Sequence, residues 1–122
     1  MITFETGITG VYNIIDTLMP SYDNQTALSL LWVCHEPEHF LFLEEFSTLA
    51  EQQRLNCNLM LRGLKEGWVG PFGAITAHHI QSFMPPPGPD TAIMLVGGPS
   101  DINHLKPILS NLGYDNVMLP IL

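Results

Sequence analysis

Apolar residues in this chain fall into short runs, separated by stretches in which they recur every three or four positions. The runs predict β-strands, and the nearly continuous run ALSLLWVC at 27–34 is typical of a central strand covered on both faces. At 55–62 apolar and polar residues alternate, which favours a half-exposed edge strand. We therefore expect strands at residues 1–4, 27–34, 55–62, 91–96 and 116–121.

The stretches between these strands predict helices with one apolar face. Pro37 suits a first helical position, and Thr76 suits the position just before a helix. Pro20 and Gly113 are typical of residues that end one. Strands that alternate with helices predict an α/β fold with a parallel sheet and right-handed crossovers. The expected helices cover residues 10–19, 37–52, 76–83 and 102–112.

Two other stretches predict loops. Residues 63–74 contain four glycines and a proline around Trp68, which indicates a loop anchored by one large aromatic ring. The proline-rich run at 85–90 cannot join a helix or a strand, because proline fixes φ and lacks a backbone donor. A rigid connector is favoured there over a ligand for a proline-binding domain, since no basic residue flanks the run.

Length and charge limit the function classes. With 122 residues the chain is expected to be one domain, residues 1–122, and 46% hydrophobic content excludes disorder. Four basic against 12 acidic residues give a formal charge of −8, which argues against binding nucleic acid or an anionic membrane. No apolar run approaches the roughly 20 residues of a membrane helix, so a cytoplasmic location is expected.

Two glycine-containing segments about ninety residues apart carry the strongest functional signal. Thr6-Gly7-Ile8-Thr9-Gly10 and Val96-Gly97-Gly98-Pro99 each follow a predicted strand and precede a helical pattern. In open α/β sheets, ligands bind beyond the carboxyl ends of the strands where the strand order reverses, and glycines there let a phosphate reach backbone N–H groups. The two segments are therefore expected to form the walls of one dinucleotide crevice.

Other reactive patterns are weaker. His35-Glu36-Pro37-Glu38-His39 matches the zinc-protease pattern H-E-x-x-H, but Pro37 keeps His35 out of the helix that His39 enters, so we expect no metal site and two solvent-facing histidines. His78 and His79 project in different directions from a helix and are expected to be solvated. We predict no catalytic side chain, because neither a nucleophile motif nor an activated cysteine is present.

The two cysteines, Cys34 and Cys57, are expected to be reduced residues that only pack. Cys34 ends one predicted strand and Cys57 lies early in the next. In parallel neighbours they would lie at opposite ends of the sheet, too far apart for a disulfide.

Taken together, the motifs resemble the NAD-binding lobe of NADH-cytochrome b5 reductase and its ferredoxin-reductase-like relatives. The resemblance covers nearly the whole chain in the right order. It rests on Met1-Ile2, Thr6-Gly7-Ile8-Thr9, the LEEF segment at 43–46, Glu66-Gly67-Trp68 followed by Gly73, the prolines at 85–87, and Val96-Gly97-Gly98-Pro99.

This resemblance implies a three-layer fold with five parallel strands in the order 3-2-1-4-5. It implies that Thr6, Gly7, Ile8 and Thr9 contact the nucleotide from one side and Gly97, Gly98 and Pro99 from the other. Hydride would pass from NADH to FAD held in a separate lobe, whose barrel and flavin motif this chain lacks, so no turnover is expected from the chain alone. The implied partners are that flavin lobe and a haem protein acceptor. NADH is expected rather than NADPH, because nothing basic follows the second strand.

Phe4 and Glu5 support an alternative interpretation. They stand where the family carries paired glycines, and no Lys or Arg precedes Arg54. A carboxylate about 6 Å from each pyrophosphate charge would cost roughly 1 to 3 kcal/mol, against about 0.3 to 2 kcal/mol returned by a helix N-terminus. The alternative is a degenerate lobe that binds no nucleotide and acts as a structural or protein-interaction module.

Overall fold

The computed structural model describes residues 1–18, 28–40, 43–51 and 55–119. Its strands are β1 (Ile2–Phe4), β2 (Ser29–Cys34), β3 (Asn56–Leu61), β4 (Ile93–Val96) and β5 (Val117–Met118). They form one sheet in the order β3-β2-β1-β4-β5, and every neighbouring pair is parallel. The predicted fold class and strand order are therefore confirmed.

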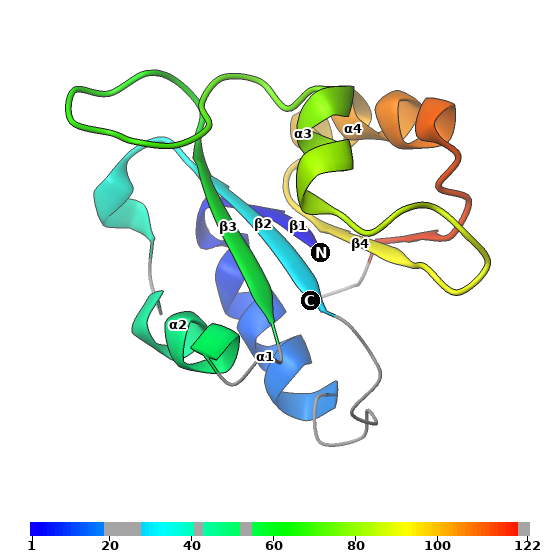
Figure 1. Ribbon diagram of the computed structural model, residues 1–122, viewed down its shortest axis with the longest axis horizontal. Coiled ribbons are helices and arrows are strands. Elements are labelled where there is room, and N and C mark those ends of the chain that lie inside the picture. Colours follow the sequence, from blue (N-terminus) through cyan, green and yellow to red (C-terminus); the bar gives the residue numbers. More distant parts are fainter. Residues whose placement is uncertain (19–27, 41–42, 52–54, 120–122) are drawn as a thin grey trace.

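Helices cover both faces of this sheet and give the molecule three layers (Figure 1). The helices are α1 (Ile8–Leu18), α2 (Leu43–Glu51), α3 (Ala77–Phe83) and α4 (Pro99–Leu112), with short 3-10 turns η1 (Glu5–Gly7) and η3 (Pro37–His39). α1 and α2 lie on one face, and α3 and α4 lie on the other. Successive β2 residues alternate between two buried clusters, with Trp32 facing α1 and α2 and Leu31 facing α3 and α4. The central strand is thus covered on both faces, as its apolar run predicts.

β3 differs from the half-exposed edge strand that its alternating sequence predicts. It does lie at the edge of the sheet, paired only with β2. Leu61 packs toward α1 and α2 as expected, but Met60, predicted to face solvent, is fully buried in the other cluster. Ile75 and Ile80 belong to the same cluster as Met60. The loop after β3 and helix α3 therefore cover a strand end that local alternation alone would leave exposed.

Several element boundaries also differ from prediction. α1 begins at Ile8 and α4 at Pro99, both earlier than expected, and the segment from Pro37 is not one helix. η3 ends at His39, and Phe40 has φ −75° and ψ 83°, outside the helical region, before α2 begins at Leu43. Gly113 ends α4 in the left-handed conformation with φ 94°, as predicted. Predicted positions at Pro20, Ala27, Phe42, Gln52 and Ile121 lie outside the described residues.

The loop at 63–74 is anchored by Trp68, as expected. The indole ring stacks on Phe40 with ring centroids 5.9 Å apart, and its Nε1 donates to the carbonyl of Pro71 at 3.0 Å. Phe40 in turn contacts Trp32 edge-on at 5.0 Å. This aromatic chain ties the outer loop to the core beneath β2.

Both cysteines are free. The β2–β3 register pairs Cys34 with Leu61 and Cys57 with Leu30, so the thiols lie at opposite ends of the two strands, as predicted. Burial raises the pKa of Cys34 to about 12 and that of Cys57 to about 11. Both thiols therefore stay protonated near neutral pH and act as packing groups. Within the described residues, no helix combines the length and the apolar character needed to cross a bilayer.

Candidate functional site

The two glycine turns lie side by side at the carboxyl edge of the sheet. β1 and β4 are direct neighbours, with Thr3 opposite Val96, and the Thr3 hydroxyl donates to the Val96 carbonyl at 3.0 Å. Gly7 packs against this pair: a Cβ atom placed on it would lie 2.7 Å from Thr3 Oγ1 and 3.1 Å from the Val96 carbonyl oxygen. The predicted adjacency of the turns is confirmed, and glycine at position 7 is required for it.

The predicted nucleotide-contacting residues differ in their solvent exposure. Ile8 is fully buried in the core, so only its backbone can face a ligand, whereas Thr9 is exposed. Gly97, Gly98 and Pro99 are all exposed, and a Cβ atom on Gly98 would meet nothing within 4 Å. The side chain of Thr6 lies outside the described part of the structure.

Phe4 and Glu5 shape the turn after β1. Phe4 is 7% exposed and lies beneath the second turn, where a Cβ atom on Gly97 would come within 2.8 Å of its ring. Glu5 has φ +51°, a left-handed conformation uncommon for a residue other than glycine. Its carbonyl accepts a hydrogen bond from Trp32 Nε1 at 3.2 Å, which holds this backbone in place.

The Glu5 carboxylate contacts three side chains that the sequence did not connect with it. Arg62 Nε donates to Glu5 Oε1 at 3.0 Å. His35 Nε2 lies 3.7 Å from Oε1, and His39 Nδ1 lies 3.6 Å from Oε2. Glu5 is therefore not an isolated charge, although its cation Arg62 also binds a second carboxylate, that of Asp101. Arg62 directly follows β3, and because the strands are parallel it emerges at the same sheet edge as Glu5.

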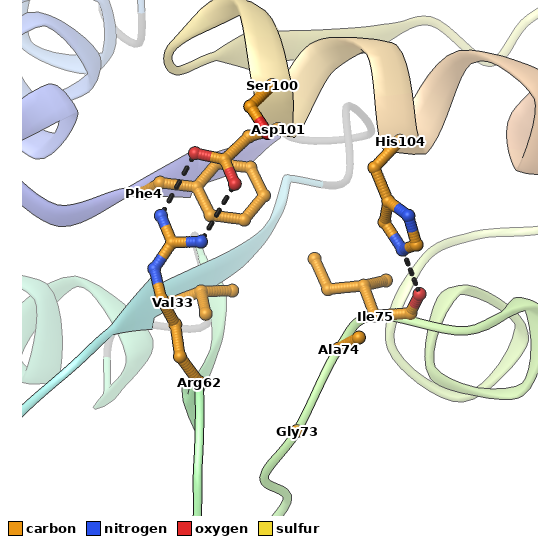
Figure 2. A pocket seen from close by; sticks show the side chains of 9 residues that line it. All are labelled: Phe4, Val33, Arg62, Gly73, Ala74, Ile75, Ser100, Asp101 and His104. Carbon is orange, nitrogen blue, oxygen red and sulfur yellow. Dashed lines mark hydrogen bonds and ion pairs between the residues drawn. The ribbon is translucent and has the colours of Figure 1, made fainter.

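Arg62 also binds Asp101 in the first turn of α4. Its Nη1 and Nη2 donate to the two carboxylate oxygens at 2.8 and 2.9 Å, and its Cζ lies 4.9 Å from the centre of the Phe4 ring (Figure 2). The hydrogen bonds to Asp101 raise the pKa of the guanidinium further above its ordinary value. The pair joins the β3 side of the sheet to α4 on the β4 side.

A cavity of about 290 Å³ opens beside this ion pair. On its far side, His104 Nε2 lies 2.8 Å from the Ile75 carbonyl. A carbonyl oxygen only accepts, so Nε2 carries the proton. The nine lining residues are Phe4, Val33, Arg62, Gly73, Ala74, Ile75, Ser100, Asp101 and His104 (Figure 2).

Sequence reasoning missed Arg62, Asp101 and His104. The signal that could have found Arg62 is its position immediately after a strand, because residues at the carboxyl ends of parallel strands gather at one edge. Asp101 lies just after the second glycine turn and could have been found in the same way.

The histidine patterns behave differently from a metal site. His35 and His39 are exposed, as expected, and each also faces Glu5. His79 Nδ1 accepts a hydrogen bond from the Thr76 backbone N–H at 3.0 Å, which supports the start of α3. Across the described ranges, no cluster of three or more His, Cys, Asp or Glu side chains is arranged to hold a metal ion.

A family model described as an oxidoreductase NAD-binding domain matches residues 1–105. The chain belongs to this oxidoreductase NAD-binding domain family. Similar proteins include NADH-cytochrome b5 reductase 1 of Mortierella alpina, 27% identical over 118 residues, covering 96% of this chain and 40% of that protein. The same-named protein of Lodderomyces elongisporus is 30% identical over 112 residues, covering 90% of this chain and 37% of that protein. The chain thus spans about two-fifths of these relatives.

Two solved structures share the fold of this chain. The cytochrome b5 reductase domain of Ulva prolifera nitrate reductase superposes with a TM-score of 0.86 at 21% identity, over 98% of this chain and 47% of that one. The CS-b5R domains of human Ncb5or, solved in an NAD+ form, give 0.84 at 15% identity, over 96% and 34%. At these identities the likeness establishes the fold.

Proposed function

We propose that this chain is the NAD(P)H-binding lobe of a flavoprotein oxidoreductase similar to cytochrome b5 reductase. The lobe would present the nicotinamide to FAD held by a separate lobe, which passes the electrons on to an acceptor such as a haem protein. The nucleotide supplies the hydride. The residues of this chain bind and orient it, and none of them acts as a catalytic acid, base or nucleophile.

The observation that carries this proposal is the junction of the two glycine turns at the switch point between β1 and β4. Each turn leads into a helix N-terminus, α1 and α4, whose first N–H groups lack helical partners and favour an anion. Thr6, Gly7, Ile8 and Thr9 would line one side of the pyrophosphate. Gly97, Gly98 and Pro99 would line the other.

NADH is the expected nucleotide. A 2′-phosphate needs a free basic group near the end of the second strand. Lys65 does reach that region, but its Nζ is paired with Glu36 at 2.8 Å. Arg62 also adjoins the end of β2, and its guanidinium binds Asp101 and Glu5 on the side of the glycine turns.

Calorimetric titration of the chain with NADH tests the proposal. We expect saturable binding to one site, with NADPH weaker. If millimolar NADH gives no heat of binding and protects no amide at the two turns from hydrogen exchange, the proposal fails.

A degenerate lobe is the second candidate, and a specific observation favours it. Phe4 fills the space beneath Gly97, and the Arg62–Asp101 ion pair occupies the edge of the sheet next to both turns. The cavity of about 290 Å³ beside this pair is lined by none of the predicted nucleotide-contacting residues, and its volume lies just below the roughly 300 to 1,000 Å³ typical of ligand pockets. In that case the chain serves as a structural or interaction module, and the same titration separates the two candidates.

A further inference from the structure

The Arg62–Asp101 ion pair lies next to both glycine turns, between which the proposed nucleotide would lie. Arg62 Nε binds Glu5 on the first turn, and the Cβ atom of Asp101 lies 3.6 Å from a Cβ atom placed on Gly97 in the second. Arg62 follows β3, whereas Asp101 follows β4, and β2 and β1 lie between those strands. Three strand spacings amount to about 14 Å. The arginine side chain and the first turn of α4 together cover this distance, and the guanidinium lies over the Phe4 ring at the end of β1.

The contacts of Arg62 divide into two sets. Its Nε is bound to Glu5, on the turn after β1, at 3.0 Å. Its two Nη atoms are bound to Asp101 in a bidentate pair at 2.8 and 2.9 Å. The side chain is about a quarter exposed, so solvent and ions reach the pair, and Phe4 supports its inner side. The bond to Glu5 therefore fixes the arginine beside the turns. The bonds to Asp101 occupy the Nη donors that a diphosphate would use.

A carboxylate and a phosphate are alternative partners for the same guanidinium fork, because both present two oxygens at matching spacing. Asp101 also places its own negative charge beside α4, where it repels an approaching anion.

We propose that Asp101 is an internal competitor for the diphosphate of the nucleotide. In the free chain it holds Arg62 across the crevice and keeps the site closed. When a diphosphate ester enters between the glycine turns, the two Nη atoms exchange the Asp101 carboxylate for phosphate oxygens, while Nε keeps its bond to Glu5. The inference deepens the proposed nucleotide-binding function and rests on it.

The main experiment compares affinities for inorganic pyrophosphate and for NADH at matched salt. Asp101→Asn keeps the shape of the side chain but removes the competing charge, and should bind pyrophosphate about 5- to 30-fold more tightly than wild type. Asp115→Asn makes the same charge change just before β5, at the opposite end of the sheet, and should alter affinity less than about twofold. In an Arg62→Gln background the gain from Asp101→Asn should disappear. The proposal is contradicted if folded Asp101→Asn binds pyrophosphate no more tightly than wild type. It is also contradicted if the gain in pyrophosphate affinity persists in the Arg62→Gln background.

A second measurement uses the wild-type chain and does not depend on any variant folding. In nitrogen-resolved spectra, pyrophosphate should shift the Nη signals of Arg62 and leave its Nε signal nearly in place. Absence of a shift at saturating pyrophosphate contradicts the exchange.

Comparing NADH affinity with pyrophosphate affinity distinguishes a failure of the Asp101 proposal from a failure of the proposed nucleotide-binding function. If Asp101→Asn gains pyrophosphate affinity but neither form binds NADH, the competition stands and the nucleotide-lobe proposal fails. If wild type and Asp101→Asn bind NADH equally, the lobe proposal stands and the competition fails.

Discussion

The two glycine turns occupy equivalent places in the fold but differ in how much free space surrounds them. Each follows a parallel strand and leads into a helix. The turn after β1 is crowded, with Phe4 buried, Glu5 in a left-handed conformation and Gly7 against Thr3. The turn after β4 is tight at Gly97, where a Cβ atom would lie 2.8 Å from the Phe4 ring, but open at Gly98, where a Cβ atom would have no neighbour within 4 Å.

This difference separates two uses of glycine. At position 7 the missing side chain lets two neighbouring strands and a turn approach each other, so it serves the fold. At position 98 no atom of the chain lies where a side chain would extend, so the missing side chain leaves the backbone accessible to a ligand.

Phe4→Ala should have the largest effect. Its ring is buried beneath Gly97 and Arg62, so truncation leaves a cavity and should lower the free energy of unfolding by about 3 to 5 kcal/mol. Phe72→Ala is the matched control, because Phe72 is 48% exposed and should lose no more than about 1 kcal/mol. Urea denaturation of both variants measures the difference. Equal losses would show that Phe4 does not support the crowded turn.

Gly7→Ala should follow. The added methyl group meets Thr3 Oγ1 and the Val96 carbonyl, both close to the backbone, so a loss of about 1 to 3 kcal/mol in unfolding free energy is expected. Thermal and urea unfolding provide the measurement. A stability equal to wild type would mean that the β1–β4 junction can open without cost.

Glu5→Gly and Glu5→Gln together isolate the backbone strain of the crowded turn. Both remove the carboxylate that binds Arg62, but only glycine relieves the positive φ at this position. Glu5→Gly should therefore be more stable than Glu5→Gln by about 1 kcal/mol. Parallel urea titrations decide this, and the reverse order would show that the left-handed conformation carries no strain.

Gly98→Ala should have the smallest effect on stability, and its main effect should be on NADH affinity. Space is free around the added methyl group and φ is −73°, so unfolding should shift by no more than about 0.5 kcal/mol. NADH affinity should fall about 3- to 10-fold if a phosphate approaches this backbone closely. Calorimetry on the same sample used for unfolding reports both quantities. Unchanged NADH affinity would remove Gly98 from the proposed site.

The fold could be predicted from the sequence because its signals are local. The apolar run in β2 and the glycine that ends α4 depend on neighbours along the chain. The burial of Met60 could not be predicted, since the loop and helix that cover it lie later in the sequence.

The positions of Arg62 and Asp101 at the carboxyl edge of the sheet could have been predicted, but the ion pairs that they form could not. Arg62 meets Glu5 across 57 positions and Asp101 across 39. Sequence spacing carries no information about ion pairs at such separations. The position of the two glycine turns was predictable, because the order of strands alone brings them together.

The aromatic contacts make the tryptophan fluorescence of this chain sensitive to its conformation. Its two tryptophans sit at different depths: Trp32 lies fully buried with its indole N–H on the Glu5 carbonyl, and Trp68 lies in the outer loop. Movement of the turn after β1 would change the surroundings of the first indole. Movement of the loop would change those of the second. Replacing Trp68 with phenylalanine would leave a single emission signal, through which the opening of the crevice could be followed in time without any attached dye.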